Sequence, residues 1–112
     1  LMVSNKPEFY VKKILKYFNI YNYFAAVSGG DTFSFRKPDP RHLIETIKLA
    51  NIKNYNCWFV GDSQNDALCA KKCKAKLILL QHGYSKENLY DYKADFVLKN
   101  LKEVSNIMLS NN

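Results

Sequence analysis

The stretch that most restricts the fold of this chain is residues 57–66, where an apolar run ends in Gly-Asp-Ser and a second aspartate follows. The first four residues of the stretch are aromatic or otherwise apolar and end in valine, which is typical of a buried parallel strand. Gly61 allows a sharp turn after that strand, and Ser63 is a favourable N-cap for a following helix. Asp62 is therefore predicted at the carboxyl end of a strand, where α/β sheets bind their ligands.

The two carboxylates of this stretch, Asp62 and Asp66, have two interpretations. Asp62 has no basic neighbour in the sequence, and a carboxylate at a strand end is a candidate Mg²⁺ ligand. Alternatively, both aspartates only cap and charge the first turn of the helix, where negative charge is favourable. Both interpretations stay open for Asp66, whereas the string as a whole favours chemistry.

The rest of the chain alternates between short apolar runs and amphipathic segments. We expect further strands at residues 1–4, 25–28, 77–80 and 95–98, and helices at 8–18, 40–51, 63–72 and 101–109. In the connection before the second strand, Ile20, Tyr23 and Phe24 are expected to pack under the sheet. Alternating β and α units of this size predict a parallel, right-handed, doubly wound α/β sheet. A length of 112 residues predicts one domain.

Composition narrows the range of functions. The net charge is +7, yet only two of the seventeen basic residues are arginines, and the lysines are spread along the chain. Base readout and bidentate phosphate contacts favour arginine, so we expect a solvated basic surface and no nucleic-acid partner. No apolar run approaches a membrane span, so no membrane partner is expected. Three cysteines, an odd number, argue against a disulfide framework and predict a reducing, cytoplasmic location.

Polar residues follow three of the predicted strands. Ser4 and Asn5 follow the first strand, Lys37 lies in the loop after the second, and Asp62 and Asp66 follow the third. Because the carboxyl ends of parallel strands open on one side of a sheet, these groups are expected to converge. A lysine that offsets phosphoryl charge, a hydroxyl donor and a Mg²⁺-binding carboxylate form a coherent set for phosphate chemistry.

Five motifs follow one another along the chain in an order that resembles a known family. They are Val-Ser-Asn-Lys at 3–6, Gly-Gly-Asp at 29–31, Arg-Lys-Pro-Asp-Pro at 36–40, Gly-Asp-Ser-x-Asn-Asp at 61–66 and His-Gly-Tyr at 82–84. Together they resemble the haloacid dehalogenase superfamily, most closely its phosphoglycolate phosphatase branch. The resemblance spans nearly the whole chain and implies a three-layer α/β/α fold with a doubly wound, mostly parallel, Rossmann-like sheet.

The resemblance also implies a role for each polar strand end. Ser4 would be a phosphate-binding hydroxyl with Asn5 beside it, and Lys37 would bind phosphate and take part in catalysis. Asp62 would be the Mg²⁺ ligand and Asp66 its supporting acid, with a part in catalysis. The implied reaction is Mg²⁺-dependent hydrolysis of a small phosphorylated substrate, such as 2-phosphoglycolate to glycolate and phosphate, through an aspartyl-phosphate in the intact enzyme.

One departure from the family matters more than the matches. The family's nucleophile belongs to a motif Asp-x-Asp-x-Thr/Val, and this sequence has no such string. The nearest imitation, at residues 31–33, lacks the second aspartate, and the family's cap domain is absent too. In this fold the missing first strand is the central one, between the strands that end at Ser4 and Asp62. Residues 1–112 are therefore expected to be the C-terminal part of a single core domain, inactive alone, with no nucleophile of its own.

Two other functions stay open beside the phosphatase. The chain is also interpretable as a non-catalytic remnant, or as half of a split protein that docks on a partner chain, because a sheet without its central strand has two unpaired inner edges. A receiver-like binding domain is disfavoured, since no acidic cluster follows the first strand. His82 follows a strand and is interpreted as a loop histidine, with catalysis as the alternative.

Overall fold

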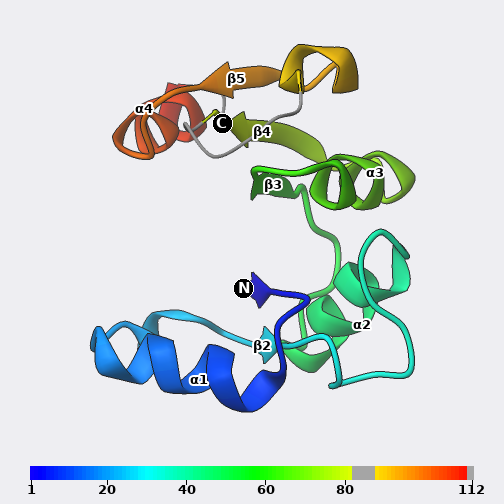
Figure 1. The fold of residues 1–112 in the computed structure, drawn as a ribbon, viewed down its shortest axis with the longest axis vertical. Coiled ribbons are helices and arrows are strands. Elements are labelled where there is room, and N and C mark those ends of the chain that lie inside the picture. The colour runs from blue at the N-terminus through cyan, green and yellow to red at the C-terminus, as the bar shows by residue number, and fades with distance from the viewer. Residues whose placement is uncertain (82–87, 111–112) are drawn as a thin grey trace. The chain divides into compact units, whose positions relative to one another are not determined.

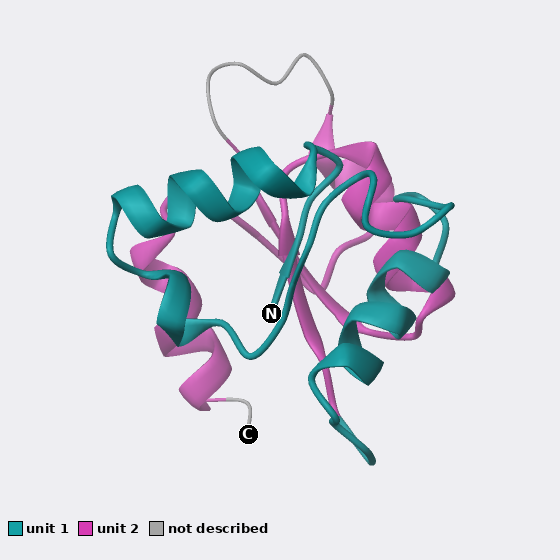
Figure 2. Ribbon diagram, turned by 90° about the horizontal axis from the view of Figure 1, so that it is seen from below, with its two compact units in different colours: residues 1–55 teal, residues 56–112 magenta. Residues whose placement is uncertain are grey.

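The computed structural model describes residues 1–81 and 88–110, in which parallel strands alternate with helices along the chain (Figure 1). The chain forms two compact units, residues 1–55 and 56–112, drawn in separate colours in Figure 2. None of the helices in the described ranges is long and apolar enough to cross a membrane.

The first unit is a pair of short parallel strands with two helices. In chain order its elements are β1 (Met2–Val3), α1 (Glu8–Tyr17), a 3₁₀ turn (Tyr21–Tyr23), β2 (Val27–Ser28) and α2 (Arg41–Leu49). β1 pairs with β2 in parallel, with Val3 opposite Ser28. Helix α1 packs on β2, while α2 packs on both strands. The core of the unit consists of Val11, Leu15, Leu43 and Ile47, all buried.

Helix α1 confirms the predicted element but buries less of its apolar surface than the periodicity indicates. Val11 and Leu15 are buried, whereas Phe9 is 68% exposed and Phe18 63% exposed. The expectation that the next connection packs under the sheet is wrong for Tyr23, which is 85% exposed, and Ile20 is exposed too. The reason is geometric: β1 and β2 have only two residues each, so the sheet contacts only a narrow strip of the surface of α1.

The second unit is a three-stranded parallel sheet. Its elements are β3 (Trp58–Gly61), α3 (Gln64–Lys72), β4 (Lys76–Leu80), a 3₁₀ turn (Leu89–Tyr92), β5 (Phe96–Leu98) and α4 (Lys102–Ser110). The strand order is β3-β4-β5, so β4 is the central strand of this sheet and its residues 77–79 are fully or almost fully buried. Three small residues of α3 (Ala67, Cys69 and Ala70) are completely buried. Small side chains allow that helix to lie close to the strands.

Two local features of the second unit depart from the usual pattern of residues. The 3₁₀ turn before β5 buries Leu89 completely, although its neighbours along the chain are polar or aromatic. Two residues after the end of α3, Lys74 adopts a left-handed backbone with φ of 56°. Glycine is the usual residue at such a helix end, because a side chain there costs free energy.

The α/β class, with helices between parallel strands, is therefore confirmed. The described strands pair as two separate sheets, one of two strands and one of three. Helix α2 begins at Arg41, one residue later than predicted, and the Arg41 N–H donates to Asp39 Oδ1 at 2.9 Å.

Candidate functional site

The carboxyl end of β1 carries the two polar residues predicted there, Ser4 and Asn5. The Ser4 N–H continues the ladder by donating to the carbonyl of Ser28 at 3.0 Å. The Ser4 hydroxyl accepts the N–H of Lys6 at 3.1 Å, which leaves its own proton to donate elsewhere. The amide of Asn5 donates from Nδ2 to the backbone carbonyl of Lys37 at 2.9 Å. Its Oδ1 is a buried acceptor that has no hydrogen-bond partner within the described residues.

Lys37 lies 32 residues after Asn5 in the sequence, in the loop that follows β2, yet it contacts the same carboxyl end of β1. Its ammonium Nζ donates to the carbonyl of Val3, the last residue of β1, at 2.9 Å. Its backbone N–H donates to Nδ1 of His42 at 3.1 Å, and the peptide bond to Pro38 is cis. The structure thus brings Ser4, Asn5 and Lys37 together at the carboxyl end of β1.

His42 is a part of this cluster that the sequence analysis missed. It lies in the first turn of α2 and is completely buried. Burial lowers the pKa of the imidazole, because it disfavours the charged form, and the nearby Lys37 charge lowers it further. Its ring meets the ring of Phe33 edge-on, with the centroids 6.1 Å apart. One feature of the sequence could have identified His42: it is a histidine on the apolar face of α2, beside Leu43 and one turn from Thr46.

Two glycines allow the chain after β2 to cross directly over the start of α1. The Gly30 N–H donates to the carbonyl of Lys6 at 2.7 Å. A Cβ on Gly29 would stand 2.5 Å from Cα of Glu8 and 2.6 Å from the Lys6 carbonyl oxygen. A Cβ on Gly30 would overlap the carbonyl group of Asn5. The polar loop after β1 is therefore held in place by backbone that leaves no room for a side chain.

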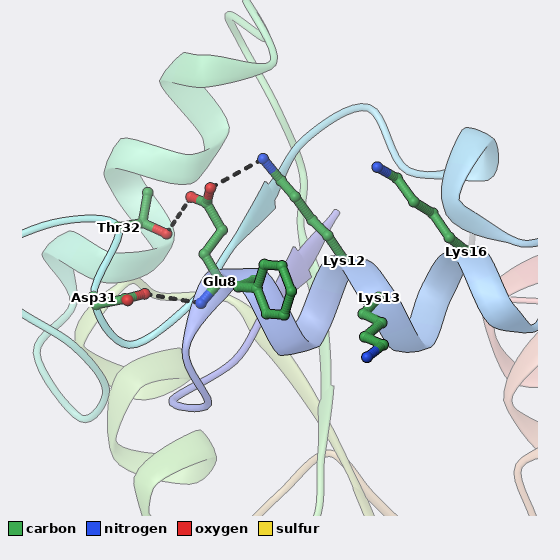
Figure 3. A pocket seen from close by; sticks show the side chains of 7 residues that line it. Glu8, Lys12, Lys13, Lys16, Asp31 and Thr32 are labelled. Atoms are coloured by element: carbon green, nitrogen blue, oxygen red, sulfur yellow. Dashed lines mark hydrogen bonds and ion pairs between the residues drawn. The ribbon is translucent and has the colours of Figure 1, made fainter.

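Asp31 and Glu8 belong to a network that closes the other side of this loop (Figure 3). Asp31 Oδ1 accepts the N–H of Glu8 at 2.8 Å, so the aspartate that imitates the family's nucleophile motif holds the first turn of α1. The Glu8 carboxylate accepts the Thr32 hydroxyl at 2.6 Å and the Lys12 ammonium at 3.0 Å. These two bonds, in that order of importance, lower the pKa of Glu8. The open depression beside them has a volume of about 800 Å³ and is flanked by the lysines of α1.

At the end of β3, the two aspartates have different surroundings. Asp62 is exposed, whereas Asp66 is buried in the first turn of α3. Asp66 Oδ2 accepts three hydrogen bonds: from the N–H of Asp62 at 2.9 Å, from the N–H of Ser63 at 3.3 Å and from the Ser63 hydroxyl at 3.1 Å. Ser63 and Asp66 together form a capping box at the start of the helix. Asp66 therefore caps the helix, as one of the two interpretations expected, while its supporting role in catalysis stays a prediction.

A Mg²⁺ ion fits the donors of this turn only in a limited way. Mg²⁺ prefers oxygen ligands and commonly keeps several waters while one or two carboxylates hold it. Asp62 supplies one exposed carboxylate of this kind, whereas Oδ2 of Asp66 is already engaged by backbone and hydroxyl donors. Within residues 1–81 and 88–110, no cluster of three or more histidine, cysteine or acidic side chains could hold a metal. The turn suits an ion bound mainly by water and by Asp62.

Two predictions about the site stay predictions. The convergence of Lys37 and Asp62 on one phosphate concerns groups in different compact units. His82, with the His-Gly-Tyr motif at 82–84, lies outside the described residues.

Replacing Asp66 by alanine is expected to lower the free energy of unfolding by about 2 kcal/mol, since it removes a cap and leaves two N–H groups without their acceptor. Asn65→Ala, one position away and exposed, is the control and should change it by less than about 0.5 kcal/mol. Urea unfolding measures both. Equal midpoints for the two variants would contradict the structural role of the carboxylate.

Comparison with known proteins adds an independent result. Residues 2–80 match the family model described as haloacid dehalogenase-like hydrolase. A phosphoglycolate phosphatase of Mesorhizobium japonicum is 37% identical over 95 residues, covering 85% of this chain and 42% of that one. One of Pseudomonas fluorescens is 39% identical over 84 residues, covering 75% and 31%. A crystal structure of a predicted phosphoglycolate phosphatase from Haemophilus somnus superposes with a TM-score of 0.86 at 28% identity, covering 95% of this chain and 48% of the other. The chain thus spans less than half the length of these proteins.

Proposed function

The chain belongs to the haloacid dehalogenase superfamily of hydrolases and is phosphoglycolate phosphatase-like, and from this membership we propose that it is the phosphate- and metal-binding part of a Mg²⁺-dependent phosphomonoesterase. The proposed substrate is 2-phosphoglycolate or another small phosphomonoester. The observation that carries the proposal is the cluster at the end of β1, where the Lys37 ammonium meets the Val3 carbonyl beside Ser4 and Asn5. The free cysteines of the chain support a reducing, cytoplasmic location.

In this proposal each side chain has a limited task. The Lys37 ammonium offsets negative charge on the phosphoryl oxygens, and the Ser4 hydroxyl donates a hydrogen bond to one of them. Asp62 holds Mg²⁺, which when bound supplies further positive charge at the phosphate. Asp66 holds the backbone of Asp62 and Ser63, so that the Asp62 carboxylate keeps its place at the strand end.

The attacking carboxylate is proposed to come from a segment outside residues 1–112. It would form an aspartyl-phosphate that water then hydrolyses. The pairing of the strands leaves room for an additional strand: within the described residues, β1 is paired only with β2 and β3 only with β4, although β2 and β5 are also paired on one side only. We propose that the intact enzyme has one more parallel strand between β1 and β3, which completes a doubly wound sheet in a three-layer α/β/α core.

The chain alone is expected to show no EDTA-sensitive turnover of p-nitrophenyl phosphate, because it lacks a nucleophile motif. A chimera in which this chain replaces the matching segment of the Mesorhizobium japonicum enzyme is expected to hydrolyse 2-phosphoglycolate with Mg²⁺. An Asp62→Asn chimera, matched in size, should lose that activity. A folded but inactive parent chimera, or an active isolated chain, would contradict the proposal.

The second candidate function is a non-catalytic half that docks on a partner chain. The observation that favours it is the pairing of β1 and β3 on one side only among the described residues, since exposed strand edges accept further strands. Mixing this chain with the remaining portion of the Mesorhizobium japonicum enzyme separates the two functions. A stable complex without turnover, seen by analytical ultracentrifugation, supports docking alone, whereas a complex with turnover supports the split enzyme.

A further inference from the structure

Three hydrogen bonds between described residues hold Lys37, in addition to any other contacts it makes, and two of them act on its backbone. Its N–H donates to His42 Nδ1 at 3.1 Å, and its carbonyl accepts the Asn5 amide at 2.9 Å. The third bond, from Nζ to the Val3 carbonyl, places the charged end of the side chain at the end of β1. The peptide groups on both sides of the Lys37 Cα are therefore fixed by side chains from other elements.

His42 is itself held rigidly in the first unit. The Thr46 hydroxyl, one turn later in α2, donates to the His42 carbonyl at 2.6 Å and also bonds to the Ser28 hydroxyl of β2 at 2.6 Å. Leu43 and Ile47 bury the same face of the helix. An imidazole that is completely buried on such a helix has little freedom to change its rotamer, so its Nδ1 is a fixed acceptor.

The protonation state of the ring follows from the geometry. A nitrogen that accepts a hydrogen bond cannot carry a proton, so a neutral His42 must carry its proton on Nε2. Nε2 is buried and has no hydrogen-bond partner within the described residues. The groups that face the ring are the Lys37 N–H, the ring of Phe33 and the backbone of Gly29, and the charges nearest to it are those of Lys37 and Asp39. The Gly29 backbone and the Asp39 charge act to raise the pKa of His42, but less strongly than burial lowers it. Burial and the Lys37 charge hold the pKa of His42 below its usual value.

We propose that His42 is a positioning residue for Lys37: its neutral, Nε2-protonated ring holds the loop so that the Lys37 ammonium stays at the end of β1, ready for a phosphoryl group. The inference rests on the proposed function for the role of Lys37 in phosphate binding. A merely structural histidine would pack in the core and stabilise the unit without a specific effect on Lys37. The two roles predict different behaviour for variants of matched shape.

The first measurement is made on the ¹⁵N-labelled chain by NMR. The ring nitrogens of His42 are expected to show an unprotonated Nδ1 and a protonated Nε2. In His42→Leu, exchange of the Lys37 amide with solvent should speed up by about tenfold relative to the Ile44 amide of the same helix, because the N–H loses its acceptor. In His42→Asn, the side-chain oxygen can take the place of Nδ1, and slow exchange should return. Leu49→Ala, at an exposed position of the same helix, is the control and should leave the Lys37-to-Ile44 ratio unchanged.

The second measurement uses inorganic phosphate as the probe. We expect phosphate to shift the Lys37 signals of the unmodified chain, to bind His42→Leu about tenfold more weakly and to bind His42→Asn almost as well as the parent. If phosphate leaves the Lys37 signals of the parent chain unchanged, the proposed function is contradicted. The ring protonation and the amide exchange then still test whether His42 holds Lys37. An Nδ1-protonated ring, an unchanged exchange ratio in His42→Leu, or equal phosphate affinity in parent and His42→Leu overturns the positioning role. If His42→Leu fails to fold, the ring protonation of the parent and the exchange in His42→Asn decide.

Discussion

Replacing Gly29 by alanine is expected to lower the free energy of unfolding by about 3 kcal/mol, the upper end of the usual cost of overpacking. The added methyl group would stand 2.5 Å from Cα of Glu8 and 2.6 Å from the Lys6 carbonyl oxygen. All the nearest atoms are backbone, so no side chain can rotate away to make room. None of the described glycines has a positive φ, so the cost arises from this close approach and not from backbone strain.

Ser34→Ala is the matched control for Gly29→Ala, because Ser34 is exposed in the loop that follows. It should change the free energy of unfolding by less than about 0.5 kcal/mol. Urea denaturation followed by circular dichroism measures both variants, and equal slopes with denaturant are needed for the comparison. A Gly29→Ala chain that unfolds at the same midpoint as the parent would show that the chain after β2 and the start of α1 are free to separate.

Replacing Lys37 by alanine is expected to reduce kcat of the chimeric phosphatase about 100- to 1,000-fold, the usual result of removing one group that stabilises charge in a transition state. The effect on stability should be far smaller, about 1 kcal/mol, which is the usual net value of a hydrogen bond such as the one from Lys37 Nζ to the Val3 carbonyl. The measurement is steady-state hydrolysis of 2-phosphoglycolate together with thermal unfolding of the same samples.

Two further substitutions identify the cause of that loss. Lys53→Ala removes the same charge from an exposed position and should leave kcat unchanged. Lys37→Arg keeps the charge but changes the shape of the donor, and we expect it to recover only part of the rate. Equal losses in Lys37→Ala and Lys53→Ala would mean that net charge, and not the placement of Lys37, controls the rate.

The parts of this molecule that were predictable from sequence are those that depend on neighbouring residues. The strand, turn and N-cap at residues 57–66 appear as expected, because the hydrogen bonds of Ser63 and Asp66 join residues only three or four apart. Asp31 shows the opposite case. The sequence around it resembles part of a catalytic motif, but its carboxylate accepts the N–H of Glu8 at the start of α1.

The features that the sequence could not predict depend on which elements lie side by side. The periodicity of α1 correctly indicates a helix, but it contains no information on how much sheet is present to cover Phe9 and Phe18. The bond from Lys37 to His42 joins residues only five apart, yet the position of His42 depends on how α2 packs on β1 and β2, where Thr46 bonds to Ser28. A buried histidine on an apolar helix face is a weak signal until its partner is known.

The hydrogen bonds around Asp66 and those around Lys37 differ in a way that concerns how the protein folds. The bonds of Asp66 span three or four residues, so closing that turn costs little chain entropy, and it can form as soon as α3 does. The bonds from Lys37 to Asn5 and Val3 join residues 32 and 34 apart. They require β1, β2 and the loop after them to be assembled first, and contacts of such separation form late. The turn at Asp62 and Asp66 is thus encoded locally, whereas Lys37 reaches its place only late in the assembly of its unit.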